Sequence, residues 1–235
     1  MTPEIRKLLA ATWPPAKTWD RGGWTLRDGA GGGSRVSAAT WSGSGAPDIA
    51  KLSAEMDVPL VMVRAGEEEL DEALDQAGFS VMDPTIAMAV EPGALAAMPP
   101  SVTSFDIWPP LAIQTELWAD AGIGSERLAI MERAQGHKTT LFGRIADRPA
   151  GVAYLACHDG GAMLHALEVA PEFRRRGLAR IMMQHAAHWA LEAGANPLTL
   201  LVTRANTAAI ALYTSLGFQV VGHYHYRIKP TKAVS

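Results

Sequence analysis

The feature that most constrains the fold is a segment in which a strand pattern, a cationic turn and a helix pattern follow one another. An apolar run over residues 163–169 leads into the sequence V-A-P-E-F-R-R-R-G-L-A, which covers residues 169–179. The periodicity then predicts a helix over residues 178–193, and Gly194 is its expected C-terminal stop. This order places a helix N-terminus directly behind a turn that contains three arginines.

The turn has the chemistry of an anion site. The first N–H groups of a helix have no intrahelical partner, and the helix start carries a partial positive charge that favours a phosphate group. Arg174, Arg175 and Arg176 add positive charge, while Gly177 lets the backbone approach a ligand and Ala179 keeps the first turn uncrowded. Neither G-x-x-x-x-G-K-[ST] nor G-x-G-x-x-G occurs at this turn. The alternative interpretation is a basic surface turn that caps a helix.

Composition narrows the classes of function. The chain has 235 residues, of which 48% are hydrophobic, so it can form one large or two small globular domains. Its net charge of −3 argues against a nucleic-acid partner. The single cysteine, Cys157, excludes an internal disulfide and a multi-cysteine zinc site, and we expect no bound metal. The lack of an apolar run of signal-peptide or transmembrane length predicts a cytoplasmic protein without a membrane partner.

A second motif follows the first. Residues 206–218 read N-x-x-A-x-x-L-Y-x-x-L-G-F. Asn206 is predicted to cap a helix over residues 207–216, and Tyr213 lies about two turns further on, so both side chains project from the same face. Taken alone, this pattern fits an ordinary helix cap with a core tyrosine. Its position after the strand and the cationic turn makes it a candidate site.

Together the two motifs resemble the GCN5-related N-acetyltransferase (GNAT) family. R-x-x-G-x-A at residues 174–179 looks like the family's loop for the pyrophosphate of acyl-CoA, and residues 206–218 are similar to its last conserved block. The predicted order over residues 101–229, β-α-α-β-β-β-α-β-α-β-β, is that of the family. The resemblance implies an α/β protein with a mixed sheet and the acyl-CoA N-acyltransferase fold, which uses acetyl-CoA as co-substrate.

The resemblance also implies the residues that contact acetyl-CoA. They are Leu167, Val169, Arg174, Arg175, Arg176, Gly177, Leu178, Ala179, Asn206 and Tyr213. The strand at residues 163–169 is expected to splay from its neighbour, so that its backbone pairs with the pantetheine arm. The N–H of Val169 would then polarise the thioester carbonyl, and Tyr213 would donate a proton to the leaving thiolate.

His165 and Glu168 are the candidates for the catalytic base. A protonated amine cannot attack a thioester, and histidine titrates near neutrality. His165 matches a histidine with this role in the arylalkylamine N-acetyltransferase subgroup, although Met163 replaces that subgroup's second histidine. Alternation predicts that His165, Leu167 and Val169 share one strand face and that Glu168 lies on the other. Glu168 acting through water is the alternative base.

The first half of the chain contains a weaker echo of the second. Residues 59–64 (P-L-V-M-V-R) resemble residues 197–202, and each run leads through a helix to a Gly-Phe pair, at 78–79 and at 217–218. When the two Gly-Phe pairs are aligned, Glu67 falls at the place of Asn206 and Leu74 at that of Tyr213, and the cationic turn is missing.

This echo predicts two domains. Residues 1–95 would be a shortened, degenerate GNAT-like domain that does not bind CoA. Residues 96–235 would be the complete catalytic copy, with the Pro- and Ala-rich residues 91–100 as the linker.

Two further stretches have alternative interpretations. The sequence D-G-A-G-G-G-S at residues 28–34 is predicted to connect strands at 24–27 and 35–41, because no helix is expected to begin there. The run Y-H-Y-R at residues 224–227 lies on a terminal strand, where it either lines the acceptor pocket, which we favour, or covers a sheet edge.

The function expected from these motifs is transfer of the acetyl group of acetyl-CoA to a primary amine of a small molecule or peptide, by direct attack in a ternary complex. The alternative is a non-catalytic CoA-binding sensor or regulatory module, against which the presence of both His165 and Tyr213 argues. The sequence leaves open whether the protein is a monomer or a homodimer.

Overall fold

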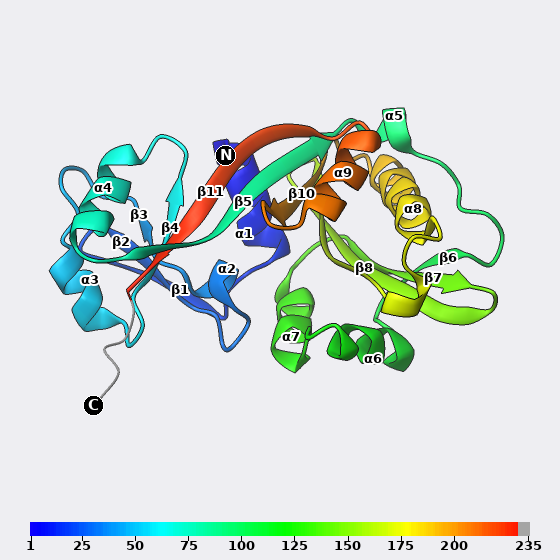
Figure 1. Cartoon of the computed structure of the whole chain (residues 1–235), viewed down its shortest axis with the longest axis horizontal. Coiled ribbons are helices and arrows are strands. Elements are labelled where there is room, and N and C mark those ends of the chain that lie inside the picture. The colour runs from blue at the N-terminus through cyan, green and yellow to red at the C-terminus, as the bar shows by residue number, and fades with distance from the viewer. Residues whose placement is uncertain (230–235) are drawn as a thin grey trace.

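The computed structural model describes residues 1–229 (Figure 1). The strands are β1 (Lys17–Arg21), β2 (Trp24–Asp28), β3 (Thr40–Trp41), β4 (Leu60–Arg64), β5 (Ser80–Val90), β6 (Ser104–Ile107), β7 (Lys138–Ile145), β8 (Arg148–His158), β9 (Gly161–Val169), β10 (Leu198–Thr203) and β11 (Gln219–Ile228). The helices are α1 (Pro3–Thr12), α2 (Ser34–Ser37), α3 (Ile49–Glu55), α4 (Glu68–Gln76), α5 (Pro92–Leu95), α6 (Ala112–Asp120), α7 (Ser125–Arg133), α8 (Leu178–Glu192) and α9 (Thr207–Ser215). A short 3₁₀ turn at Pro171–Phe173 precedes α8.

A mixed sheet organises the described residues. Eight of their strands are ordered β4-β11-β5-β10-β9-β8-β7-β6, and β1, β2 and β3 form a smaller antiparallel sheet. Within the large sheet β9 and β10 are parallel neighbours, while β6 to β9 form an antiparallel meander. This mixed α/β architecture confirms the fold class predicted from the motifs.

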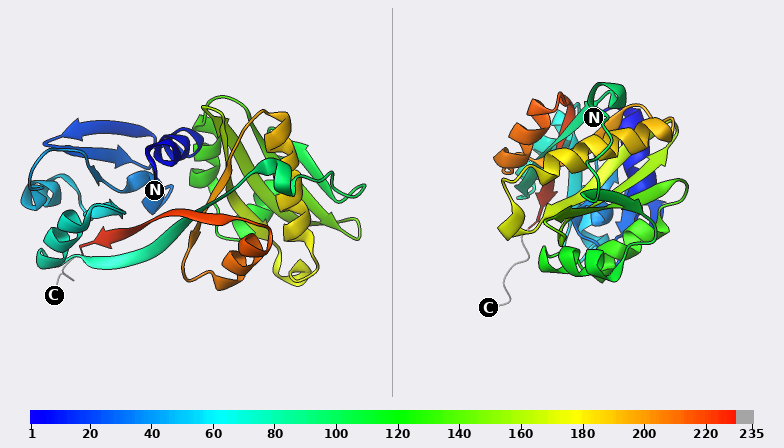
Figure 2. Two further views of the ribbon diagram at one scale, coloured as in Figure 1. Left: turned by 90° about the horizontal axis from the view of Figure 1, so that it is seen from above. Right: turned by 90° about the vertical axis from the view of Figure 1, so that its right-hand side faces the viewer.

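Helices cover both faces of the half of the sheet that contains β6 to β10 (Figures 1 and 2). On one face, Met182 and Met183 of α8 pack with Leu155 and Leu164, in a core that also includes residues of α5 and α9. On the other face, α1, α6 and α7 enclose Tyr154 and other residues of β8 and β9. Burial recurs along α8 at the spacing of helical turns, which is why this segment is stable as a helix on a sheet.

The long strands β5 and β11 run side by side from one lobe of the molecule to the other (Figure 1). β5, from the first half, lies between β10 and β11 of the second half, while β11 lies between β5 and β4 of the first half. The two halves therefore exchange strands and share one sheet. The predicted division between residues 95 and 96 would separate strands that pair within this one sheet, and it stays a prediction.

The pairing in this region is internally symmetric. Arg64 pairs with Tyr224, and Thr203 pairs with Thr85. The two pairs are equivalent when Arg64 is matched with Thr203 and Thr85 with Tyr224, which is the register that aligns the two Gly-Phe pairs. This symmetry is what the sequence echo predicts for the strands, and the further interpretation of the first half as a degenerate domain stays a prediction.

The expectation for the glycine-rich stretch at residues 28–34 was wrong. Instead of a strand over residues 35–41, the helix α2 begins directly after Gly33, and only the short β3 follows. A Cβ at Gly32 would lie 2.4 Å from Cδ1 of Ile130, so this loop packs closely against α7. That long-range contact, which the local pattern does not contain, favours a compact helical turn here.

Candidate active site

The centre of the site is the gap between β9 and β10. The two strands pair only from Ala162 to Leu164 on β9 and from Leu198 to Leu200 on β10, and then separate. Ala170 donates a backbone hydrogen bond to Ala150 at 2.9 Å, so its neighbour Val169 occupies the alternate position, whose N–H points away from β8. Val169 therefore presents its backbone to the gap, and the side chain of Arg174 donates to its carbonyl at 3.0 Å.

A β-bulge in β9 changes which side chains face the site. One residue of β8 lies opposite two of β9 at Ala166 and Leu167, and Ala166 has φ of +51°. As a result His165 pairs with Tyr154 and Glu168 pairs with Val152, which share one sheet face.

The predicted alternation along β9 was therefore wrong. Leu167 and Val169 pack on the α8 face, whereas Glu168 lies on the face of His165. The bulge adds one residue, and one residue reverses every later side chain. The indole N–H of Trp118 donates to the carbonyl of Ala166 at 2.9 Å, so α6 holds the bulge in place.

The cationic turn lies at the N-terminus of α8. Gly177 is the N-cap residue with φ of +87°, and a Cβ there would meet nothing within 4 Å. The first helical bond runs from Ile181 to the carbonyl of Gly177, which leaves the N–H groups of Leu178 and Ala179 outside the intrahelical pattern. Arg174, Arg175 and Arg176 are exposed.

Leu178 differs from the other residues of this turn. Its side chain is buried against β7 and β8, close to Gly143 and Gly151, so only its backbone is available to a ligand.

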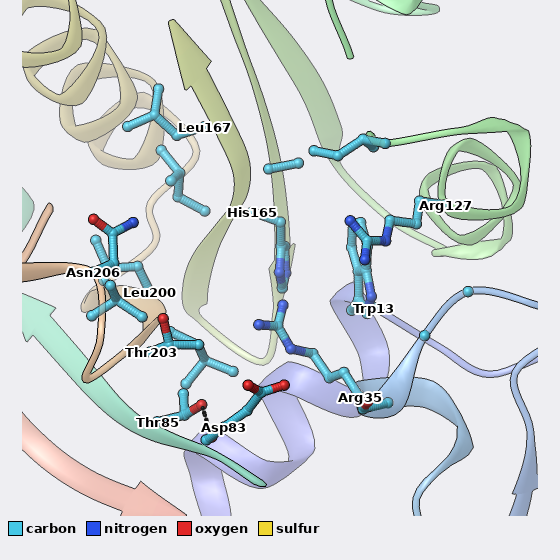
Figure 3. Close-up of a pocket in the computed structure, with 18 of the residues that line it drawn as sticks. Trp13, Arg35, Asp83, Thr85, Arg127, His165, Leu167, Leu200, Thr203 and Asn206 are labelled. Atoms are coloured by element: carbon cyan, nitrogen blue, oxygen red, sulfur yellow. Dashed lines mark hydrogen bonds between the residues drawn. The ribbon is translucent and has the colours of Figure 1, made fainter. Parts of the chain in front are cut away.

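A cavity of about 410 Å³ opens along the same gap (Figure 3). Five of the predicted site residues line it: His165, Leu167, Glu168, Asn206 and Tyr213. The residues of the cationic turn are not on its wall. Asn206 caps α9 by accepting from the N–H of Ala209 at 3.1 Å, as predicted, which leaves its amide group free to donate.

His165 is enclosed by residues of the first half. Its ring stacks on Trp13 with a centroid separation of 4.8 Å, and Nε2 lies 2.9 Å from Oγ1 of Thr12. Because the Thr12 hydroxyl donates its proton to the carbonyl of Leu8, it accepts from Nε2–H of His165. This network assigns the neutral tautomer with an unprotonated Nδ1. Burial, together with the charge of Arg35, lowers the pKa of His165 well below its usual value.

The pKa values of Glu168 and Tyr213 are both raised. Burial raises the pKa of Glu168, and the charges of Arg174 and Arg127 oppose that rise. Burial and the neighbouring Glu168 raise the pKa of Tyr213 to about 12. Tyr213 is therefore a phenol at neutral pH and can act as a hydrogen-bond donor in the cavity.

Part of the cavity wall was missed from the sequence. It comes from Trp13, Arg35, Asp83 and Arg127, of which three belong to the first half (Figure 3). Arg35 stands on α2, directly after the glycine-rich stretch whose helical turn was not predicted. A glycine cluster followed by a single arginine was the one local signal that pointed to it.

The run at residues 224–227 is divided between two roles. Tyr224 and Tyr226 line the cavity, as favoured from the sequence. His225 and Arg227 instead pair with Asp71 on α4, at 2.8 and 2.6 Å. Alternation along β11 separates the two pairs of side chains.

Neither a metal site nor a membrane span is found in the part of the chain that the structure describes. Within residues 1–229, no three His, Cys, Asp or Glu side chains are grouped to bind a metal ion. None of the helices in that range has the length and apolar character needed to cross a bilayer.

The splayed parallel strands, the glycine-capped cationic helix and the tyrosine-bearing α9 define an acyltransferase of the N-acyltransferase fold. Residues 107–218 match the model of the Acetyltransferase (GNAT) family. This match confirms, for residues 107–218, the GNAT family that the sequence motifs predicted.

Relatives agree with this assignment. The chain is 27% identical to "Uncharacterized N-acetyltransferase YobR" of Bacillus subtilis, over 96% of this chain and 98% of that protein. It is 36% identical to streptothricin acetyltransferase of Streptomyces lavendulae over 105 residues, which cover 44% of this chain and 55% of the relative. Among solved structures, a GCN5-related N-acetyltransferase from Kribbella flavida shares the fold with a TM-score of 0.72 at 19% identity, covering 98% of this chain and 96% of that one.

Proposed function

We propose that the chain transfers the acetyl group of acetyl-CoA to a primary amine of a small molecule or peptide, by direct attack of the amine in a ternary complex. The observation that carries this proposal is the gap between β9 and β10, toward which the N–H of Val169 points. The streptothricin acetyltransferase relative, by its name, acts on a small molecule, and this supports the acceptor class.

The residues around the gap fit acetyl-CoA. Open space at Gly177 and the free N–H groups of Leu178 and Ala179 suit a pyrophosphate, with Arg174, Arg175 and Arg176 beside them. The backbone of Leu167 and Val169 and the amide of Asn206 are available to the pantetheine arm. None of these groups is a carboxylate, which would repel the negatively charged pyrophosphate.

Each remaining group has a defined role in the transfer. Acetyl-CoA supplies the acetyl thioester. The N–H of Val169 donates to the developing oxyanion. His165 accepts the amine proton at Nδ1, or Glu168 accepts it through water, and Tyr213 donates its proton to the leaving sulfur. A C–N bond forms and the C–S bond breaks. Counted from its ammonium form, the amine loses two protons, one of which is balanced by the proton gained by the thiol while the other is released through the base to solvent.

The experiment that tests this function measures thiol release from acetyl-CoA with a panel of amines, peptides and antibiotics, and identifies the product by mass. We expect one or more amines to gain an acetyl group. If the protein binds acetyl-CoA but none of the amines causes thiol release, the non-catalytic sensor is the correct interpretation.

The base is assigned by two variants. His165→Gln and Glu168→Gln each keep a polar side chain of similar size and remove one proton acceptor. We expect kcat to fall by about 10²–10⁴-fold in the variant that lacks the base and much less in the other.

We also propose that the first half is a degenerate copy that leaves CoA binding to the second. Glu67 is at the N-cap position of α4 but forms no capping hydrogen bond with its side chain, whereas Asn206 caps α9, and the buried Leu74 is at the position that corresponds to Tyr213. A calorimetric stoichiometry near one acetyl-CoA per chain supports this, and a value near two contradicts it.

A further inference from the structure

An arginine from the first half extends into the cavity beside the proposed base. Arg35 stands on α2, and Figure 3 shows its guanidinium directed toward the ring of His165, with Asp83 of β5 on the same side. The charge of Arg35 is close enough to lower the pKa of His165. The guanidinium therefore lies near the position at which an acceptor amine would react.

Arg35 has no counter-ion of its own in residues 1–229. Its Nε is buried without a hydrogen-bond partner, and no ion pair within 4.0 Å joins it to a carboxylate in that range. The groups that raise its pKa are the side chains of Tyr224 and Tyr226. Burial acts to lower the pKa of Arg35 and these tyrosines raise it, with a net shift upward, so the guanidinium keeps its charge.

Two other shielded arginines, Arg64 and Arg227, have carboxylate partners, although Nε of Arg64, like that of Arg35, has no hydrogen-bond partner. Arg64 pairs with Glu67, and Arg227 pairs with Asp71 and Asp75. Arg27 donates to the carbonyl of Ala38 at 2.7 Å. A buried charge without a counter-ion is costly, so its retention on a cavity wall points to a ligand that supplies the opposite charge.

The second cation on the wall, Arg127, is exposed to solvent rather than buried. Arg127 of α7 lies close enough to Glu168 to lower the pKa of that carboxyl, against the effect of burial. Asp83 is exposed at the cavity and forms no ion pair with Arg35 within 4.0 Å. Within the described residues, the wall thus offers one shielded guanidinium without a counter-ion, that of Arg35, together with carboxylates that can face an ammonium group.

We propose that Arg35 binds a carboxylate of the acceptor, and that the acceptor is consequently an amino acid, which carries a primary amine and a free carboxylate in one small molecule. The proposal rests on the acetyltransferase function proposed above. A guanidinium binds a carboxylate through two parallel hydrogen bonds, which orients the acceptor as well as attracting it. A polyamine or an aminoglycoside would instead leave the charge of Arg35 unmatched.

The test compares matched acceptors. A panel of free L-amino acids and the corresponding L-amino acid carboxamides is assayed with acetyl-CoA, and kcat/KM is measured by thiol release. We expect the free acid of a pair to be preferred by about 10–100-fold, which is the discrimination that a hydrogen bond to a charged group provides. In Arg35→Gln this preference should disappear, and in Arg35→Lys part of it should remain.

Controls separate binding from folding. Acetyl-CoA affinity by calorimetry should be unchanged in Arg35→Gln, which shows that the site is intact. Arg21→Gln removes one positive charge from an exposed position on β1 of the same half and should keep the preference for the acid. Equal activity on acids and carboxamides in the parent overturns the proposal, and so does an equal loss on both in Arg35→Gln.

A second measurement keeps this proposal distinct from the proposed function. The same acid and carboxamide pairs are titrated calorimetrically into the protein saturated with CoA. If the acid binds more tightly than the carboxamide and Arg35→Gln removes this difference, the carboxylate site is supported even when no pair is acetylated. The lack of acetylation would then contradict only the proposed acetyltransferase function. Equal binding of both members overturns the carboxylate site even if amines are acetylated.

Discussion

At the scale of single residues, the environment of His165 decides its protonation state. The ring lies between Trp13, the hydroxyl of Thr12 and the charge of Arg35, all from the first half. Burial and a neighbouring cation both disfavour imidazolium, so the ring is neutral at pH 7. A histidine base in this place is ready to accept a proton near neutrality, and the acid limb of its pH–rate profile lies at lower pH than an unperturbed histidine would give.

The lowered pKa of His165 predicts a pH dependence of stability. In the unfolded chain the pKa of this histidine is about 6.5, whereas in the folded protein its pKa is well below that value. Between these values the unfolded state binds more protons, so stability falls as the pH drops below about 6.5. We expect the Tm of the parent to fall more steeply from pH 7.5 to 5.5 than that of His165→Gln, measured by circular dichroism. Parallel Tm profiles in the two proteins would contradict this.

The hydroxyl of Tyr213 is expected to act in the transition state. Its pKa of about 12, raised by burial and Glu168, keeps it protonated at working pH. Tyr213→Phe should lower kcat by about 10²–10⁴-fold and leave acetyl-CoA affinity nearly unchanged, because the hydroxyl stabilises charge that develops on the sulfur. Steady-state kinetics with calorimetry measures both.

A matched control for this variant is Tyr154→Phe. The hydroxyl of Tyr154 donates to the carbonyl of Met131 at 3.3 Å within the core, and this tyrosine does not line the cavity. Its kcat should stay near that of the parent. Similar losses in both variants would show that the loss at Tyr213 reflects packing.

At the scale of elements, β9 and α8 build the donor side of the site by different means. β9 uses a bulge at Ala166, locked by Trp118, to turn Glu168 toward the face of His165 while Val169 keeps its backbone toward the gap. α8 uses a left-handed glycine at its N-cap to expose its first N–H groups. Both devices act through the backbone, so substitutions there test geometry as well as side-chain chemistry.

Two glycines that flank α8 allow a matched test of the cationic turn. Gly177 and Gly194 flank the helix, both have positive φ, and a Cβ at either meets nothing within 4 Å. Gly177→Asp and Gly194→Asp therefore introduce comparable backbone strain and the same charge. We expect only Gly177→Asp to weaken acetyl-CoA binding, by about 10-fold or more, because its carboxylate would repel the pyrophosphate. Calorimetry measures the affinity of both variants. Equal affinities of the two variants would place the pyrophosphate elsewhere.

At the scale of the whole molecule, the first half completes both the sheet and the cavity. β11 has both of its sheet neighbours, β4 and β5, from the first half, and β10 has β5 on one side. Arg227 of β11 also bonds to Asp71, Asp75 and the carbonyl of Phe79, which all belong to the first half. The site residues of the second half are therefore held in place by strands that lie before residue 96.

The exchanged strands predict that neither half is stable alone. A fragment of residues 96–235 would expose both edges of β11 and one edge of β10, which are templates for aggregation. We expect this fragment to be insoluble or unfolded by circular dichroism and to regain structure when co-expressed with residues 1–95. A folded fragment that binds acetyl-CoA without the first half would contradict the prediction and would support the independent domains expected from the sequence.

The sequence by itself determined the parts of the protein that depend on neighbouring residues. The α8 helix, the Asn206 cap of α9 and the order of strands and helices from β6 to α9 follow from periodicity and from local backbone chemistry. The two strands predicted after α9 were wrong, because the single long strand β11 continues across both sheet neighbours, β5 and β4. The family could be recognised for the same reason, since its two motifs each lie within a short stretch of chain.

The tertiary structure alone decided how these parts face one another. The face of Glu168 depends on a bulge that Trp118 holds from 48 positions away, and the place of β5 depends on pairing with β10 and β11. Arg35 and Trp13 enter the cavity because the first half folds over the second, and α2 forms where Gly32 packs on Ile130. Each of these depends on contacts between distant residues, whose free energy is absent from any local pattern in the chain.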